Sequence, residues 1–508
     1  MLWMAVYLVL VALGRYFISG ALEYDEAEQF LHAQFLLPGY GPQPPLFEWL
    51  IHGLFLINGT SFLALLLFKA AMLWVVFWAV GRIFLLLTGR EDLAVAASYA
   101  VFLLPILSWA APRTLTHTLL AMMFSALFVL GLLVRALPRR RASSAQDQHQ
   151  AADRWWIAAL ALSAAGALLS KYSMAPVLLM YLLATLSVPQ WRSRLWNWQI
   201  FAAAGLAGVI VAPHGWWVWT HLSEVRAPIM VKLNAVDTTA SNGFLQSGGT
   251  ALISGLLGFI ALPTLVWAYL WVWNRFRFGT AGKGERGASA WSPDLRTAML
   301  AYFAMFALFC TTIIFGPGTA GFRNRWLAPF LMLLPAGAVI WATVQPQTEA
   351  LLCRLVTISR GLLVVAGIGL VLRVPLSGWI GKPGWANLPV TEIAHDVKSM
   401  TKPSALVLVA NMQLAGSLEM RLEDRLTFEI NSSVAALLKP RSCELLLVVP
   451  EPDDDSSSEK TAELQQLAAR FLKQGEPGDV RWVAARRNHK YRFSDETLDL
   501  LYLAAKGC

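Results

Sequence analysis

The sequence is short of charge and of cysteine. Only 14% of its 508 residues are Asp, Glu, Lys or Arg, and 56% are hydrophobic, whereas an ordinary soluble domain carries about 25% charged residues. This shortage excludes a soluble globular enzyme and a disordered chain. The four cysteines are too few and too scattered for the disulfide framework of a small secreted module. We therefore expect them to say nothing about the redox compartment.

Long apolar runs take the place of charge. A membrane span needs about 20 apolar residues, and about eleven candidate runs follow one another along the chain. They lie at residues 2–19, 62–88, 92–111, 115–137, 155–170, 172–188, 197–219, 249–274, 297–316, 325–344 and 354–374. The first run has no basic residues before it, so we expect a retained span rather than a signal peptide. The expected fold class is a polytopic α-helical membrane protein.

Charged loops predict the orientation of the spans. The formal net charge is +9, and Lys and Arg gather in the loops after the second, fourth, sixth and eighth runs. Such loops stay in the cytoplasm, so the positive charge needs no nucleic-acid partner to explain it. The loop at 20–61 contains neither Lys nor Arg and is expected outside. The N-terminus is then cytoplasmic, and the C-terminal segment lies outside.

The composition changes after residue 375 and predicts three parts. Residues 1–375 form the membrane domain, and 376–387 form a linker rich in Gly, Pro and Trp. The third part, 388–508, has dense and nearly balanced charges, which predicts a small extracytoplasmic α/β domain.

Short apolar runs predict the elements of this last part. Ala405–Ala410 and Leu445–Val449 have the length of strands, while Ala462–Leu472 and Asp495–Ala505 have helical spacing. The acidic, Ser-rich stretch Glu451–Glu459 predicts a solvated loop.

Candidate chemistry gathers in the first outer loop. Four carboxylates fall within the six residues Glu23–Glu28, and no cation accompanies them. Packed acids raise one another's pKa, bind divalent cations, or present a base to a substrate hydroxyl. An ordinary solvated acidic loop is the alternative. Two amphipathic helices, near 24–37 and 46–55 and separated by Pro44-Pro45, would lie along the membrane surface.

Several short motifs, spread from this loop to the tenth run, resemble a known family. They are Tyr24-Asp25-Glu26-Ala27, Pro38-Gly39-Tyr40, Gln43-Pro44-Pro45-Leu46, Ser170-Lys171-Tyr172 and Arg323-Asn324-Arg325-Trp326. In order and type they are similar to motifs of the bacterial GT-C glycosyltransferases of the family 39/83 type. That superfamily includes protein O-mannosyltransferases and lipid A aminoarabinose transferases, and the rhizobial galacturonosyltransferases are near this chain.

This resemblance implies an inverting glycosyltransferase of the bacterial inner membrane. The donor would be a polyprenyl-phosphate-linked sugar in the outer leaflet, and the acceptor lipid A, lipopolysaccharide or a related envelope glycan. The sequence has no Rossmann-type glycine-rich loop, which agrees with a donor that is not a nucleotide sugar. A protein acceptor is the runner-up, and the sequence does not identify the sugar.

The resemblance also implies roles for single residues. Asp25 matches the first acid of the family's pair and would be the general base for the acceptor hydroxyl, with Glu26 the next choice. Cations at the outer face would stabilise the charge that grows on the departing phosphate. The candidate cations are Lys69, Lys171, Arg323 and Arg325, and the remaining candidates for substrate binding are Tyr40, Gln43, His117, His214 and Arg226.

A metal role for Asp25 stays open at this point. His117 stands about where relatives carry a second acid, and Pro42-Gln43 stands where metal-binding relatives carry an acid before the Pro pair. A divalent cation, Mg²⁺ or Mn²⁺, would have Asp25 as its candidate ligand. His117 could equally be a structural histidine, and Lys69 could be a snorkelling side chain at a helix end.

Two rival functions remain. A lipid or oligosaccharide transporter should carry charges near the bilayer midplane and paired broken helices. This chain instead gathers its unusual residues at one membrane face, which favours the enzyme. An inactive scaffold of the same fold is the third possibility.

Overall fold

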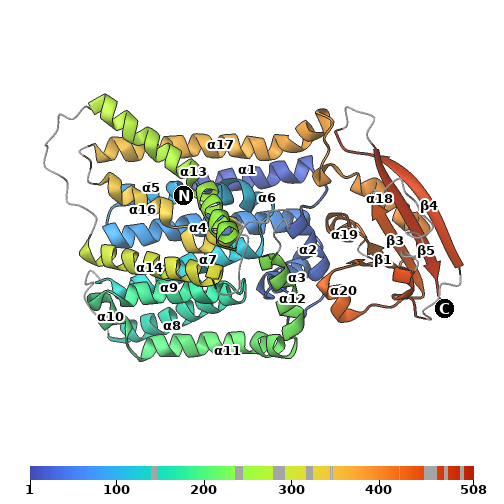
Figure 1. Cartoon of the computed structure of the whole chain (residues 1–508), viewed down its shortest axis with the longest axis horizontal. Helices are drawn as coiled ribbons and strands as arrows, with labels where there is room; N and C mark the ends of the chain where they lie inside the picture. The colour runs from blue at the N-terminus through green and yellow to red at the C-terminus, as the bar shows by residue number, and fades with distance from the viewer. Residues whose placement is uncertain are drawn as a thin grey trace.

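A computed structural model gives the fold of the chain. It describes residues 1–138, 146–234, 244–278, 292–315, 324–343, 345, 347–422, 424–450, 466–473, 479–491 and 497–507. Long helices lie side by side in one bundle, and a small β-sheet lies beyond one end of it (Figure 1). The short helices of the first outer loop lie at that same end, between the bundle and the sheet.

A helix falls on each of the eleven predicted apolar runs. In chain order these are α1 Leu2–Ile18, α4 Phe62–Thr88, α5 Glu91–Val101, α7 His117–Ala136, α8 Gln146–Leu168, α9 Met174–Leu186, α11 Trp198–Thr220, α13 Phe244–Phe278, α14 Pro293–Phe315, α15 Asn324–Leu331 followed by α16 Leu334–Ala342, and α17 Thr348–Trp379. Among the described residues, six helices are long and apolar enough to cross a membrane, or up to nine if each of three bent pairs is one span. The chain is thus a membrane protein with several apolar helices, and the count of eleven remains a prediction.

Two of the three bent pairs interrupt predicted spans, and the third lies at the end of one. The axis turns by 70° between α5 and the segment formed by η1 Ile106–Ala110 and α6 Ala111–Arg113, and by 112° between α9 and α10 Pro189–Leu195. The turn between α15 and α16 is 41°. Pro105 directly precedes η1, and Pro189 is the first residue of α10. Proline has no backbone N–H, so a helical hydrogen bond is missing where each of these two segments begins.

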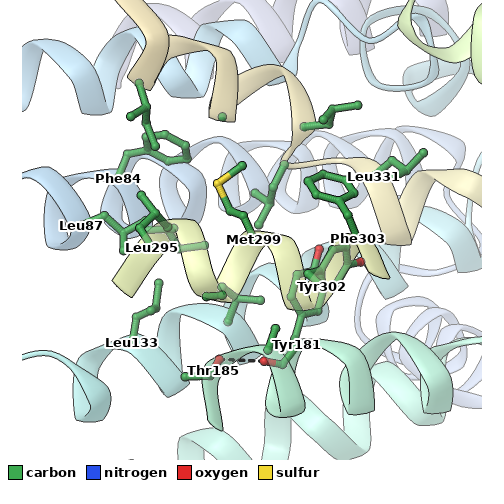
Figure 2. A pocket seen from close by; sticks show the side chains of 18 of the residues that line it. Phe84, Leu87, Leu133, Tyr181, Thr185, Leu295, Met299, Tyr302, Phe303 and Leu331 are labelled. Carbon is green, nitrogen blue, oxygen red and sulfur yellow. Dashed lines mark hydrogen bonds between the residues drawn. The ribbon is translucent and has the colours of Figure 1, made fainter. Parts of the chain in front are cut away.

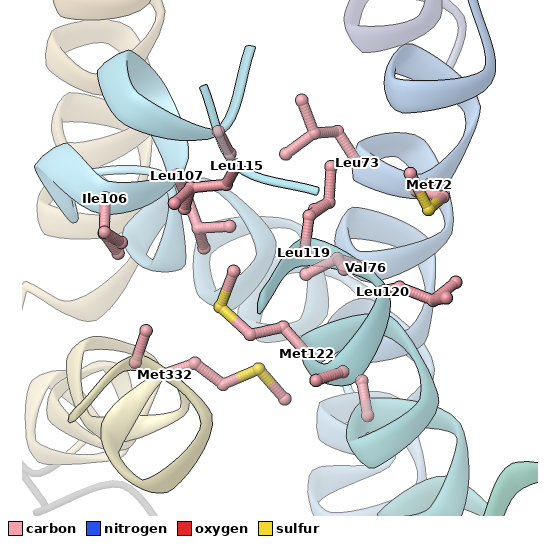
Figure 3. Close-up of a cluster of buried hydrophobic side chains, with 14 of the residues drawn as sticks. Met72, Leu73, Val76, Ile106, Leu107, Leu115, Leu119, Leu120, Met122 and Met332 are labelled. Atoms are coloured by element: carbon pink, nitrogen blue, oxygen red, sulfur yellow. The ribbon is translucent and has the colours of Figure 1, made fainter. Parts of the chain in front are cut away.

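The centre of the bundle is formed by helices that are apolar on every side. Met72, Leu73 and Val76 of α4 face Leu119 and Leu120 of α7, and all five side chains are buried (Figure 3). A helix that is hydrophobic all round can be covered by other helices or by lipid, and α4 and α7 are the ones that other helices cover.

The sheet has five strands in the order β2-β1-β3-β5-β4. Its strands are β1 Leu406–Val409, β2 Leu426–Glu429, β3 Glu444–Pro450, β4 Asp479–Asn488 and β5 Thr497–Lys506. β1 pairs in parallel with β2 and β3, and β5 pairs antiparallel with β3 and β4. The helices beside it are α18 Val390–Met400, α19 Met412–Glu419 and α20 Ser433–Leu438. The two predicted strands, 405–410 and 445–449, are confirmed as β1 and β3.

The predicted helical segment Asp495–Ala505 is wrong, because residues 497–506 form β5. Leu498, Leu500 and Tyr502 are buried in alternation, as a strand of period two requires. Leu503 and Ala505, on the second face of β5, are buried too, and this blurs the alternation in the sequence. β2 and β4 were not predicted. The acidic stretch 451–459 and residues 462–465 of the other predicted helix lie outside the described residues.

The junction between bundle and sheet is a packed turn. α17 continues through Pro375 to Trp379, and α18 begins at Val390. Between them the buried Asn387 side chain donates to the carbonyls of Val374, at 2.8 Å, and Lys490, at 3.1 Å. The end of α17 is thereby joined to the segment that follows β4.

One expectation about cysteine needs correction. Cys443, at the start of the sheet's third strand, is disulfide-bonded, whereas Cys310 and Cys353 are free. Disulfides persist in oxidising compartments and are rare in the cytoplasm, so the cysteines do carry information on location.

Candidate active site

The first outer loop folds into two short helices at the sheet end of the bundle (Figure 1). They are α2 Tyr24–His32 and α3 Leu46–Asn58. α2 begins with a capping box, in which the Glu26 carboxylate accepts the Glu23 backbone N–H at 3.0 Å. α2 ends before the predicted residue 37, and α3 begins directly after the Pro pair, as predicted.

Glu26 and Lys69 pair with each other inside the protein. Glu26 is fully buried; its Oε1 lies 2.8 Å from Lys69 Nζ, and its Oε2 lies 3.5 Å from Arg15 Nη2. Lys69 also donates to the Arg113 carbonyl at 3.1 Å. Neither residue lines the polar cavity described below. Two residues with predicted roles in catalysis and phosphate binding thus hold each other in place.

Glu23 extends this network to two more helices. Its Oε1 contacts the Arg373 guanidinium of α17, and it lies 3.7 Å from Arg113 Nε of α6. With Arg15 of α1 and Lys69 of α4, four helices hold the first turn of α2 through ion pairs. These ion pairs fix the position of α2 through Glu23 and Glu26. They thereby fix the direction in which Asp25, on the same turn, points.

Asp25 opens instead onto a polar cavity of about 460 Å³. The cavity lies where α2, α7, α15 and the short link between α8 and α9 meet. It brings together five of the predicted site residues, Asp25, Gln43, His117, Lys171 and Arg325, and its other lining residues are Tyr24, Glu28, Thr114, Thr116, Thr118 and Trp326. Arg323 lies outside the described residues.

Asp25 has the electrostatic setting of a base. Burial raises the pKa of its carboxyl to about 6, and the nearby charge of Glu28 adds to this effect. Arg325, His117 and Lys69 act in the opposite direction, and Arg325 Nη1 lies 3.9 Å from Asp25 Oδ1. A carboxylate with a pKa close to neutral can accept a proton from a hydroxyl and is still ionised at pH 7.

Lys171 also lines the polar cavity. It belongs to the five-residue link between α8 and α9, and its Nζ donates to Thr118 Oγ1 at 3.0 Å and to the Arg325 carbonyl at 3.4 Å. Arg325 therefore contacts Lys171 through its backbone and Asp25 through its side chain. Lys171 and Arg325, both predicted to bind the donor phosphate, thus lie next to each other.

An apolar cavity of about 220 Å³ adjoins the polar one. The two share Gln43, Lys171 and Trp326 in their walls. The rest of the apolar cavity is lined mainly by α14 and α15, and its lining residues there include Phe306, Phe309, Cys310, Ile313, Leu327 and Phe330. The polar and the apolar cavity are thus neighbours at Lys171.

A third cavity, of about 150 Å³, lies deeper in the bundle and shares Phe330 with the second (Figure 2). Met299, Tyr302 and Phe303 of α14 point into it from one side, and Leu133 of α7 and Tyr181 of α9 from others. Its walls are almost entirely apolar, so it offers room for hydrocarbon and few partners for water.

Three other predicted residues do not line the polar cavity, and two of them, Tyr40 and His214, support the loop. The Tyr40 hydroxyl donates to the Phe35 carbonyl at 2.5 Å. His214 Nδ1–H donates to the Pro38 carbonyl at 2.9 Å, which holds α11 against the loop. Arg226, on α12 Leu222–Asn234, is exposed and does not contribute to the described cavity walls.

The turn at Pro38-Gly39-Tyr40 has no room for a side chain at position 39. A Cβ there would lie 2.2 Å from the ring of Trp217, so no other residue fits unless the Trp217 side chain or α11 moves. The turn that carries Gln43 to the cavity depends on this close approach.

Sequence reasoning missed Glu48, a fully buried carboxylate on α3. Its Oε1 lies 3.1 Å from His117 Nε2 and 3.5 Å from His32 Nδ1. A single acid among the apolar residues of Leu46–Asn58 was the available signal, because an ionisable group in such a helix is costly unless it is paired.

A metal ion at Asp25 stays a prediction. Within the described ranges, no group of three or more His, Cys, Asp and Glu side chains is arranged to hold one. In the polar cavity the Arg325 guanidinium lies 3.9 Å from Asp25 Oδ1 and supplies positive charge beside it.

The known proteins to which this chain is similar are glycosyltransferases. The family described as dolichyl-phosphate-mannose-protein mannosyltransferase (PMT_2) matches residues 42–217. The lipopolysaccharide core galacturonosyltransferase RgtA of Rhizobium johnstonii is 30% identical over 433 residues, which cover 83% of this chain and 80% of RgtA. RgtB of the same organism, which has the same description, is 26% identical over 96% of this chain and 95% of its own.

The solved structures include a similar fold. The structure of ArnT from Cupriavidus metallidurans bound to undecaprenyl phosphate superposes with a TM-score of 0.55 and 14% sequence identity. It covers 99% of this chain and 97% of ArnT. The bundle and the small sheet are thus the ArnT-like GT-C fold, over almost the whole length of both chains.

Proposed function

Since this chain belongs to the family of membrane glycosyltransferases that includes the rhizobial lipopolysaccharide core galacturonosyltransferases, we propose that it transfers a sugar from a polyprenyl-phosphate donor to a lipopolysaccharide or lipid A acceptor. The undecaprenyl phosphate bound by ArnT is the chemical class of donor that we transfer to this chain. The family assignment leaves the transporter alternative without support.

The observation that carries the proposal is the meeting of two cavities at Lys171. A polyprenyl-phosphate sugar is polar at one end and hydrocarbon at the other. The polar cavity, of about 460 Å³, would take the sugar and phosphate, and the apolar cavity, of about 220 Å³, the first isoprene units. The third cavity, which shares Phe330 with the second, would take hydrocarbon further along the tail.

Asp25 is the proposed general base. It would accept the proton of the acceptor hydroxyl while that oxygen attacks the anomeric carbon from the face opposite the phosphate, which inverts the configuration. Its ionised form at neutral pH and its place in the cavity wall support this role. Glu26 would act only by holding α2 through Lys69 and Arg15.

Lys171 and Arg325 are the proposed partners of the leaving group. As the bond between sugar and phosphate breaks, the electron pair stays on the lipid phosphate, and fixed cations stabilise that growing charge. The contact between Lys171 Nζ and the Arg325 carbonyl supports a shared position for the two cations. Gln43, in the walls of both cavities, would contact the sugar at their junction.

The proposed setting is the bacterial inner membrane, crossed eleven times. The N-terminus would be cytoplasmic, and the polar cavity and the sheet periplasmic. The disulfide at Cys443 supports an oxidising environment for the sheet, and the Lys- and Arg-rich loops after even-numbered runs support the same orientation. A protein acceptor is the alternative, which the PMT_2 match keeps in view.

The test is a transfer assay with purified protein. Polyprenyl-phosphate galacturonate and a lipopolysaccharide core acceptor should yield free polyprenyl phosphate and an acceptor that is heavier by one sugar, measured by mass spectrometry. Asp25→Asn should abolish transfer, and Lys171→Ala should raise the KM for the donor more than that for the acceptor. Lys402→Ala, on the exposed side of the sheet, is the control. Full activity of Asp25→Asn would refute the proposed base.

A further inference from the structure

Glu48 is a buried carboxylate with a restricted set of partners. It lies on α3, has no exposed surface, and Phe47 and Ile51 beside it are equally buried. In the part of the chain that the structure describes, the charged groups within ion-pair distance of it are the rings of His117 and His32. The nearer contact, 3.1 Å, is to His117 Nε2.

A carboxylate in such a place must be neutralised. An ionised group away from water costs several kcal/mol unless an opposite charge lies beside it. Burial alone would raise the pKa of Glu48, but the two histidine rings more than offset this and lower it to about 2. Glu48 is therefore ionised at neutral pH, and the groups placed to neutralise it are the two imidazole rings beside it.

The geometry favours His117 as the protonated ring. Its Nε2 lies closer to the Glu48 carboxylate than His32 Nδ1 does. His32 is farther from Glu48, at 3.5 Å, and stacks on the ring of Tyr40, with 5.4 Å between the ring centres. His117 also lines the polar cavity, which His32 does not.

A positive charge on His117 acts on the proposed base. His117 and Asp25 both line the polar cavity, and the charge of His117 lowers the pKa of Asp25 against the effects of burial and Glu28. Arg325 and Lys69 act in the same direction from other helices. The charges of Glu28, His117, Arg325 and Lys69, together with burial, thus set the pKa of Asp25.

We propose that Glu48 is a positioning residue for the transfer reaction, which keeps His117 as an imidazolium in the cavity wall and thereby keeps Asp25 ionised. His117 would supply a fixed positive charge beside the base, and Glu48 itself would not touch the substrate. This inference rests on the proposed function, because it gives Asp25 the role of base.

The sign of the effect follows from the charges. Glu48→Gln removes the carboxylate, so His117 loses its proton and the cavity loses a positive charge. The pKa of Asp25 then rises further above about 6, and the acid limb of the pH profile of kcat/KM moves to higher pH. Arg325 and Lys69 remain in place, so we expect a partial shift of about half a pH unit or more. Activity should fall most near pH 6 and least near pH 8.5.

A double-mutant cycle tests whether Glu48 acts through His117. His117→Asn alone should move the acid limb as far as Glu48→Gln does, and Glu48→Gln in the His117→Asn background should move it no further. His32→Asn is the matched control and should leave the acid limb in place. The double variant also removes both members of the pair, so no lone buried charge remains to unfold it.

The outcomes separate this inference from the proposed function. An acid limb that stays in place in either Glu48→Gln or His117→Asn, or shifts that add in the double variant, would overturn the role of Glu48. If the wild type transfers no sugar at all, the proposed function fails instead. A uniform loss of activity at every pH, with an unchanged acid limb, would assign Glu48 a purely structural role.

Discussion

Two neighbouring acids of α2 have opposite surroundings. Asp25 faces the polar cavity, where burial holds its pKa near 6. Glu26, one position later, points into the protein and is neutralised by Lys69 and Arg15. Successive residues of a helix differ by about 100° in direction, so one position is enough to separate a chemical role from a structural one.

Conservative amide substitutions should therefore have different consequences at the two positions. Asp25→Asn should abolish transfer and leave the melting temperature unchanged or higher, because the buried carboxylate is ionised at a cost. Glu26→Gln should destabilise the fold by about 3 kcal/mol or more, since it leaves Lys69 and Arg15 buried without a counter-charge. Thermal unfolding in detergent and the transfer assay, run on both variants, measure the two effects. Equal losses of stability would contradict the assignment.

The same pKa predicts how transfer depends on pH. Asp25 must be ionised to accept a proton, and its pKa is about 6. We expect kcat/KM of the wild type to fall as the pH drops through about 6. If the base had the ordinary pKa of an aspartate, kcat/KM would fall only as the pH drops to about 4. A profile that is flat between pH 5 and 8 would argue against Asp25 as the base.

The sequence could predict single residues only where the motif itself was the signal. Asp25, Gln43, Lys171 and Arg325 were predicted from their motifs, and the structure brings them to one cavity. The pairing of Glu26 with Lys69, which lie 43 positions apart, could not be predicted, because either residue alone looks like a functional group in a membrane protein.

Among the elements, α2 is held on its outer side by α19 of the sheet region. The backbone of α19 approaches so closely that a Cβ on Gly416 would lie 2.4 Å from the Cα and carbonyl oxygen of Ala27. The Leu22 N–H donates to Ser417 Oγ at 3.0 Å beside this contact. The helix that carries the proposed base is therefore packed between the ion-pair network of the bundle and α19.

Gly416→Ala should disturb this packing. The added methyl group meets backbone atoms, which cannot rotate away, so α19 and α2 must separate. We expect a loss of roughly 1–3 kcal/mol in stability and a lower kcat. Gly205→Ala on α11, where a Cβ meets nothing within 4 Å, is the matched control and should change neither. Wild-type stability and kcat in Gly416→Ala would show that α19 does not support α2.

Elements were predictable where their environment is simple. The apolar runs predicted helices, because a span must satisfy its own backbone. β5 was mistaken for a helix, because side chains on both of its faces are buried and its sequence does not alternate cleanly between apolar and polar residues. The 112° bend between α9 and α10 was not predicted either, although Pro189 stands at its start.

At the scale of the whole molecule, the proposed site lies at the end of the bundle that faces the sheet (Figure 1). The proposed orientation places that end in the periplasm. A cysteine introduced at Lys402, in the sheet region, should react with a membrane-impermeant maleimide in intact cells. A cysteine introduced at the exposed Arg90, between α4 and α5, should react only after the inner membrane is opened. The reverse pattern would invert the topology and remove the periplasmic site.

The overall architecture was largely predictable, whereas the assembly of the cavity was not. Hydropathy predicted a bundle of apolar helices, and the composition after residue 375 predicted a part with strands. The orientation that the loop charges predict stays a prediction. The cavity combines residues from the first loop, α7, the α8–α9 link and α15. Their approach depends on how the helices pack, which no local pattern in the sequence encodes.

The free thiol of Cys310 in the apolar cavity offers a native reporter of donor occupancy. A lipid tail that fills this space would shield the sulfur, while a vacant groove would leave it open to a small lipophilic alkylating agent arriving through the bilayer. The rate of its modification would then measure the affinity for intact donors and for unreactive analogues. Cys353, which is exposed and lines none of the three cavities, would serve as the internal reference.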